Sequence, residues 1–242
     1  MPRFAGIALR VLVVLLALGF VGYRYLLGRE PVPEQSGYAL DLDEIRRLAA
    51  SLPGERASRV NHEQIAEAPL PRGAVFAGES LRTPHPMSHG AYQLVFPDGY
   101  LVIDSGFDAA GLREMSPGAA LDADGYTAIQ RALATARAIV ITHEHADHWT
   151  ADQLERIVEN NPDARLFGPA GVVAAASAFT IEKVAPGDTI TVGNFTLAFF
   201  GGKHAEIHSS IPIIDNVGVL VDDALYYGGD SYSVPEASVA VL

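Results

Sequence analysis

The segment "AIVITHEHADHWT" (138–150) decides how the rest of the chain is interpreted. It begins with a short apolar run rich in β-branched residues, 138–142, which predicts a buried strand. It continues with "HEHADH" (143–148), which places three of the chain's eight histidines within six positions. A helix is expected from Thr150 onward. Polar side chains in a loop between a buried strand and the next helix lie where α/β proteins usually bind ligands.

The residue types in this loop favour a metal site. His143 and His145 alternate along the strand end, so both imidazoles are able to point to one side, and Asp147 and His148 follow as the chain turns. Neutral imidazole and carboxylate oxygen are the ligands of zinc, and of manganese or iron where oxygen ligands are more numerous. The alternative is a solvated polar loop, and the density of ligand side chains argues against it.

The composition is that of a folded globular protein, with 49% apolar and 19% charged residues among 242. The absence of cysteine excludes thiolate metal sites, thiol nucleophiles and disulfides. The formal net charge is −12, and because the first thirty residues are net basic, the acidic balance lies in the remainder. So acidic a body repels phosphate, and no nucleic-acid partner is expected.

Residues 1–28 are predicted to be an N-terminal membrane anchor or signal segment. The apolar stretch 4–27 contains Arg10, and if that side chain snorkels, about twenty residues are available to span the bilayer. A cleavage site at "ALG" (17–19) would leave a very short apolar region before it, so an uncleaved membrane helix fits better than a cleaved signal peptide or a core helix. The usual arrangement of a single anchor places the body outside the cytoplasm, in the periplasm or at the cell surface.

The rest of the chain divides into a linker and a domain. Residues 29–72 are predicted to be a linker or stalk with a short helix at 41–52, where Asp41 and Glu44 have the spacing of a capping box. The polar, proline-rich stretch after this helix is expected to be a stalk or an arm lying on the domain. Residues 73–242 are predicted to be one domain of sheets covered by helices. The expected strands are 73–78, 91–96, 100–104, 138–142, 164–168, 181–185, 189–192, 195–200, 217–222 and 224–229, and the expected helices are 126–136, 150–160 and 169–177.

The motif "THEHADH" (142–148) resembles the H-x-H-x-D-H signature of the metallo-β-lactamase superfamily. The resemblance covers residues 73–242 and implies an αββα sandwich, that is, two mixed β-sheets covered by helices, which usually binds two metal ions. In "VIDSG" (102–106) it implies a structural role for Asp104 in supporting the metal loop.

The resemblance also implies the remaining ligands. The family's third metal histidine follows a later strand, where "FTLAFFGGKHAEIH" (195–208) offers His204 and His208, and His204 is favoured because it lies nearer the sheet edge. The bridging aspartate is Asp230 in "ALYYGGDSY" (224–232). The sixth ligand, a C-terminal histidine, has no counterpart, so either the chain is truncated or its lineage lacks that ligand.

The expected site therefore has two parts. The first metal is held by His143, His145 and His204, and the second by Asp147, His148 and the shared Asp230. One or two zinc ions are expected, with manganese or iron as alternatives.

The expected activity is that of a hydrolase. It uses metal-bound hydroxide on an ester, lactone, phosphodiester or related small molecule, anionic or carbonyl-containing, and Asp147 takes a proton as the leaving group departs. A degenerate member that keeps the fold as a metal-binding scaffold is the alternative. A di-iron redox protein is disfavoured, because the length leaves no room for a flavin domain.

The remaining candidate residues carry weaker signals. His85 and His89 lie in a proline-broken stretch, 83–90, that is interpreted as a solvated loop in preference to a substrate contact. His62 lies in the predicted stalk with no visible partner, and Trp149 is expected to pack beneath the metal loop.

Overall fold

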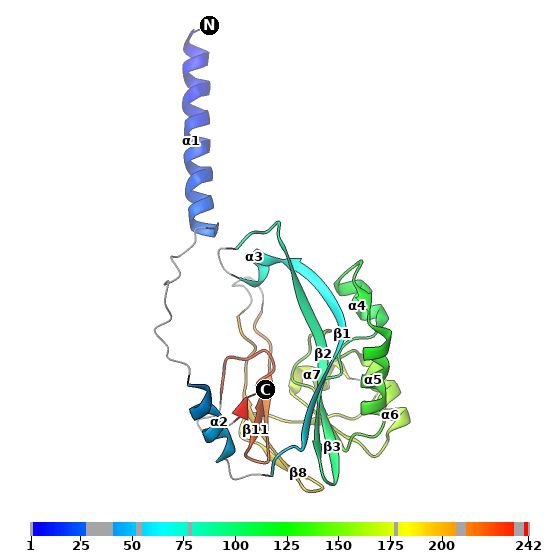
Figure 1. Cartoon of the computed structure of the whole chain (residues 1–242). Coiled ribbons are helices and arrows are strands. Elements are labelled where there is room, and N and C mark those ends of the chain that lie inside the picture. The colour runs from blue at the N-terminus through cyan, green and yellow to red at the C-terminus, as the bar shows by residue number, and fades with distance from the viewer. Residues whose placement is uncertain are drawn as a thin grey trace. The chain divides into compact units, whose positions relative to one another are not determined.

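The computed structural model describes residues 2–27, 41–51, 55–76, 79–176, 179–206, 212–234 and 240–241. They form two compact units, of which the first comprises Met1–Leu40 with Pro69–Met87 and the second Asp41–Ala68 with Ser88–Leu242. Figure 1 shows the elements of both units.

The first unit contains the apolar helix α1 (Pro2–Leu27). Its segment Gly6–Arg24 has a mean hydropathy of 2.2 and is long and apolar enough to cross a membrane. Length and composition fit a membrane anchor and a signal sequence equally.

The predicted strand at 73–78 is wrong, because the chain forms a helical turn, α3 (Arg72–Val75). The chain folds back on itself here, with the N–H of Gly73 donating to Ser80 O and the N–H of Phe76 donating to Arg72 O. A Cβ at Gly73 would lie 2.5 Å from the carbonyl oxygen of Glu79, so only glycine fits this close approach.

The second unit is built on two mixed sheets. Sheet A has the order β4-β1-β2-β3-β5-β6-β7 and sheet B the order β12-β11-β10-β9-β8. The strands of sheet A are β1 (Arg59–Pro71), β2 (Pro84–Phe96), β3 (Gly99–Ile103), β4 (Ala120–Leu121), β5 (Ala138–Val140), β6 (Arg165–Gly168) and β7 (Glu182–Lys183). Those of sheet B are β8 (Thr189–Val192), β9 (Phe195–Gly201), β10 (Val217–Val221), β11 (Leu225–Tyr227) and β12 (Ala240–Val241).

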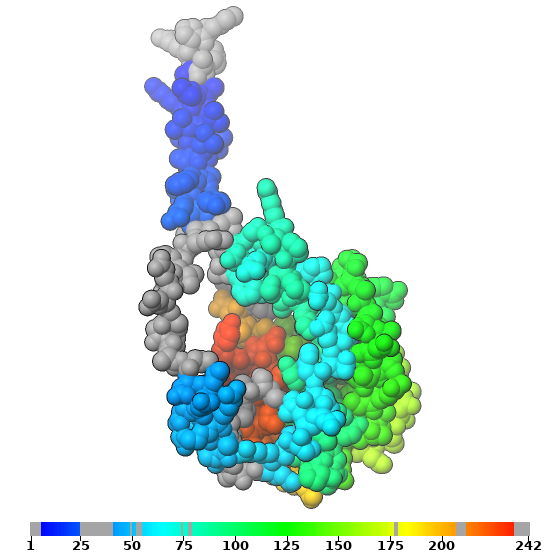
Figure 2. All heavy atoms as spheres, in the orientation of Figure 1, coloured from blue at the N-terminus to red at the C-terminus, as the bar shows by residue number. Residues whose placement is uncertain are grey.

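Two apolar layers hold the sheets and helices together. Alternate residues of β5 face opposite ways: Ile139 packs with helix residues, and Ala138 and Val140 pack between the sheets. The helices are α2 (Leu42–Ala50), α4 (Ala109–Met115), α5 (Ala123–Leu133), α6 (Ala151–Asn160) and α7 (Ala170–Ala175). Helices α4 to α6 lie on the side of sheet A away from β8 and β11, and the green residues around α4 and α5 form part of the surface in Figure 2. This arrangement confirms the predicted α/β sandwich.

Of the two alternatives for the stretch before residue 72, a free stalk is wrong, because residues 59–71 form β1 of sheet A. The strand was missed because most of its side chains are polar or exposed, and only Ile65, Ala66 and Ala68 are buried. These three residues are covered by segments far away in the sequence. One such segment follows β4, where the N–H of Asp122 donates to Ile65 O.

The parallel strands β3 and β5 bring two loops to one edge of sheet A. Both strands end there, and the N–H of Asp104 donates to Val140 O. Sheet B is tied to the same place, since the N–H of Val217 donates to the carbonyl of Thr142. At the end of β9, Gly201 and Gly202 have φ values of +87° and +131° and turn the chain toward this edge.

Candidate metal centre

Asp104 is the buried anchor of the loop after β5. Its backbone has a φ of +60°, a conformation that aspartate tolerates better than most residues, and it is 1% exposed. Its Oδ1 accepts hydrogen bonds from the N–H and the hydroxyl of Thr142, at 2.9 and 3.0 Å. Its Oδ2 accepts one from Nδ1 of His148, at 2.7 Å. The carboxylate therefore fixes both ends of the histidine-rich loop.

The environment of His148 favours its charged form in the metal-free protein. Burial alone would lower its pKa, but the charge and hydrogen bond of Asp104, with Asp230 and Asp147, raise the pKa to about 11. Because Nδ1 donates to Asp104, the other nitrogen, Nε2, faces Asp230 Oδ1 at 3.7 Å and Asp147 Oδ2 at 3.9 Å. Loss of the proton from Nε2 would leave a lone pair directed at these carboxylates, which is the state that binds a metal.

Hydrogen bonds also fix which nitrogen of His143 and His204 is free. The hydroxyl of Thr142 donates to Asp104, so it accepts from Nδ1 of His143, 3.1 Å away. Nδ1 of His204 lies 2.6 Å from the carbonyl of Ala205, which only accepts. When these rings carry one proton each, the lone pair is therefore on Nε2.

These nitrogens meet in one cluster. Ligand atoms of His143, His145 and His204 all lie within 4.8 Å of one another, and the ring of His145 stands edge-on to the other two, with centroids 4.8 and 4.7 Å away. Tetrahedral zinc with nitrogens at about 2.1 Å needs ligand atoms about 3.4 Å apart, so small movements suffice. The structure thus places His204, from the turn after β9, where the sequence predicts it; His208 lies outside the described residues.

The chemistry of this cluster fits a divalent metal. Nε2 of His143 and Nε2 of His204 are buried and form no hydrogen bond within the described part of the chain. Burial, then the charge of His148, lowers the pKa of His143 to about 4, so its ring is neutral. Burial also lowers the pKa of His145. Neutral imidazoles with unused lone pairs are zinc ligands, and no other described group satisfies those of His143 and His204.

Asp230 stands between the two parts of the site. Its Oδ2 lies 3.3 Å from Nε2 of His204 and 4.0 Å from Nε2 of His143. Burial would raise its pKa, but the hydrogen bond and charge of His148, followed by the charges of His143 and His204, hold the pKa well below the usual range. The carboxylate is therefore ionised and lies beside both His143 and His204.

The second part of the site differs from the expected one. The compact group contains His143, His148 and Asp230, so His143 belongs to both parts. Asp147 is displaced toward β2, where its Oδ2 lies 3.4 Å from Nδ1 of His89. The interpretation of His89 as a loop residue is therefore wrong: it lies in β2, and its partly buried side chain faces the metal loop. His85 lies in the same strand but packs edge-on against Phe76, with ring centroids 4.9 Å apart.

A local signal in the sequence could have placed His89 correctly. Ala91 follows it two positions later and is buried, so alternation along β2 would have placed His89 on the same, inward face. The prediction for Trp149 is confirmed, since it is 4% exposed and packs in the helix-side core.

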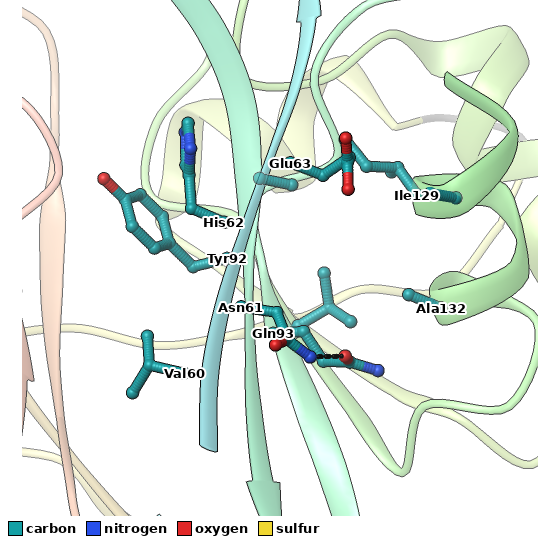
Figure 3. A pocket seen from close by; sticks show the side chains of 11 residues that line it. Val60, Asn61, His62, Glu63, Tyr92, Gln93, Ile129 and Ala132 are labelled. Carbon is teal, nitrogen blue, oxygen red and sulfur yellow. Dashed lines mark hydrogen bonds between the residues drawn. The ribbon is translucent and has the colours of Figure 1, made fainter. Parts of the chain in front are cut away.

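His62 also has a partner, contrary to the expectation. Its ring packs on Tyr92, with centroids 4.8 Å apart. Both side chains line a cavity of about 480 Å³ beside β1, β2 and α5, which Figure 3 shows together with Glu63 and Ile129. None of the residues expected to bind metal lines this cavity.

Comparison with known proteins agrees with this fold. A family model described as the beta-lactamase superfamily domain matches residues 99–242. "Protein Rv0786c" of Mycobacterium tuberculosis is 37% identical over 110 residues, which are 43% of this chain and 51% of that protein. The match thus spans about half the length of that relative.

Solved structures share the fold at low identity. One is a mutant of AiiA from B. thuringiensis with N-decanoyl-L-homoserine bound at its active site; it has a TM-score of 0.52 and 10% identity, over 74% of this chain and 78% of that one. Another, from work on the optimization of new enzyme function, has a TM-score of 0.51 and 11% identity, over 73% and 76%. Since the family model covers more than half of the sequence, the chain belongs to the beta-lactamase superfamily and has the metallo-β-lactamase fold.

Proposed function

We propose that this protein is a metal-dependent hydrolase of a small-molecule ester, lactone, phosphodiester or related substrate. One observation carries the proposal: ligand atoms of His143, His145 and His204 converge beside the ionised carboxylate of Asp230. Zinc suits this set of nitrogen and oxygen ligands, with manganese or iron as alternatives. A bound divalent metal supplies Lewis acidity, which polarises a carbonyl or phosphoryl oxygen and makes water more acidic.

The protein's own residues orient this chemistry. Asp104 and Thr142 hold His143 and His148 so that each ring directs Nε2 inward. Burial would raise the pKa of Asp147, but the contact with His89 and the charge of His148 lower it, so the carboxylate is ionised and able to accept a proton. We assign Asp147 that catalytic role.

The charges of the site favour an anionic or carbonyl-containing substrate. Asp147 and Asp230 would offset only part of the charge that two divalent ions add, so the loaded site is positive within an acidic protein. The acidic net charge of the protein argues against nucleic acid as the substrate, because it repels phosphate.

Metal analysis and a substrate panel test the proposal together. The parent chain, His143→Ala and His145→Ala are dialysed, analysed for metal, and assayed on a p-nitrophenyl ester, an acyl lactone and bis-p-nitrophenyl phosphate. We expect metal-dependent hydrolysis of at least one substrate by the parent, and loss of metal and activity in both variants. Equal metal content in all three chains would refute the site. Metal binding without hydrolysis would instead support a non-catalytic metal-binding module.

We further propose that α1 anchors the domain at a membrane, with the domain outside the cytoplasm. The apolar segment Gly6–Arg24 supports the anchor. The full chain should remain in the membrane fraction after a carbonate wash, and a chain without residues 1–28 should be soluble. Protease added to intact cells with a permeable outer layer should digest the domain. A soluble chain with an intact N-terminus would refute the anchor, and protection from protease would refute the orientation.

A further inference from the structure

We infer that His89 is a positioning residue that holds Asp147 in place for the second metal, an inference that rests on the proposed metal site. Nδ1 of His89 lies 3.4 Å from Oδ2 of Asp147. The same oxygen lies 3.9 Å from Nε2 of His148. Oδ2 of Asp147 is therefore flanked by one imidazole of the metal loop and one from β2.

His89 is itself held firmly. Its side chain is 10% exposed, and its ring packs on Phe107, which is fully buried, with centroids 5.0 Å apart. The next residue, Gly90, lies so close to β1 that a Cβ there would stand 2.1 Å from the carbonyl oxygen of Glu63. The backbone of β2 therefore has little freedom at this point, and the imidazole is fixed by packing before any contact with Asp147.

Asp147 needs such a partner more than the buried histidines His143 and His204 do. His143, His148 and Asp230 form a compact group, whereas Asp147 is not part of it. Its side chain is one-quarter exposed, while those of His143 and His204 are 0% and 6% exposed. A nitrogen donor beside Oδ2 restricts the rotation of the carboxylate and keeps that oxygen near Nε2 of His148. Partners that orient a ligand in this way typically alter metal affinity 10–100-fold when they are removed.

The substitution His89→Phe separates this role from simple packing. Phenylalanine preserves a ring on Phe107 but has no N–H donor, so the melting temperature of the metal-free protein should change little. His89→Gln keeps a donor without the ring and should restore part of the function. The matched control is His62→Phe, which replaces another histidine that packs on an aromatic ring, Tyr92.

Zinc titration against a competing chelator, followed by isothermal calorimetry, measures the two metals separately. In His89→Phe we expect the weaker metal to bind about 10–100-fold less tightly, with the tighter metal unchanged. His62→Phe should match the parent for both metals, and His89→Gln should lie between. Unchanged affinity of the weaker metal in His89→Phe would overturn this inference alone. Equal loss at both metals, or a lower metal-free melting temperature, would show a structural role and also overturn it. A parent chain that binds no second metal would overturn it as well, and one that binds no metal at all would overturn the proposed function.

Discussion

Replacement of Asp104 by asparagine should damage the metal site through the tautomer of His148. Asparagine accepts the positive φ of this position and keeps one oxygen for the two donors of Thr142. Its amide nitrogen, however, would face Nδ1 of His148, which now donates to the carboxylate at 2.7 Å. Two donors cannot pair, so His148 should become neutral with the proton on Nε2, the nitrogen that a metal needs.

The structure bounds the size of the effect in the metal-free protein. Removal of one partner of a buried ion pair typically costs about 3–5 kcal/mol. Here the histidine is able to lose its proton, so the cost should fall toward about 1.5–3 kcal/mol, the contribution of one charge-assisted hydrogen bond. The pKa of His148 is raised to about 11 in the folded protein, so the pair stabilises fully below pH 6.5 and the stabilisation is lost as the pH rises through 11. The deficit of Asp104→Asn should therefore be largest in mild acid.

Urea unfolding with a chelator at pH 6 and pH 9 measures the stability, and zinc titration measures the second metal, whose affinity should fall at least tenfold. Asp122→Asn is the matched control. Asp122 caps α5 by accepting from the N–H groups of Asp124 and Gly125, and asparagine caps equally well, so little change is expected. If Asp104→Asn bound both metals as tightly as the parent, the argument from the tautomer would be wrong.

Three further predictions concern other parts of the second unit. A Cβ at Gly171 would lie 1.3 Å from Oε2 of Glu144, the far end of a flexible side chain, so Gly171→Ala should displace this carboxylate and destabilise the protein by at most about 1 kcal/mol; a larger loss in urea unfolding would contradict this. His204→Ala should lose the tight metal while His208→Ala keeps it, as elemental analysis would show, and the reverse result would exchange their roles. Burial raises the pKa of Asp222, so its ionised form costs stability above that pKa. Asp222→Asn should therefore stabilise the protein at pH 7, by less than about 1 kcal/mol because water screens the charge, with the gain vanishing near pH 3 in urea unfolding.

Local sequence patterns predicted the centre of the fold well. The strand–loop–helix around the histidine motif appears as β5, the loop and α6, because a short apolar run and an amphipathic helix are local signals. The helix expected at 41–52 is α2, with Asp41 as its N-cap. The failures lie where burial is decided by distant segments: β1 is mostly polar, and the turn at α3 depends on a close approach to Glu79.

The candidate site shows the same division between local and tertiary information. The motif supplies the ligand types, and its spacing places His143, His145 and His148 in one loop. Which nitrogen each ring presents is decided elsewhere: Asp104 at the end of β3 sets His148, and the carbonyl of Ala205 sets His204.

The contact between His89 and Asp147 joins β2 to the metal loop, and no spacing within either segment encodes it. A ligand motif therefore specifies that a metal binds, while the strands that pack around it set how firmly each ligand is held. On this reasoning the two metals should differ in affinity. His143 and His204 of the histidine cluster are buried and their tautomers are fixed, whereas Asp147 is more exposed and lies between His148 and His89 of β2.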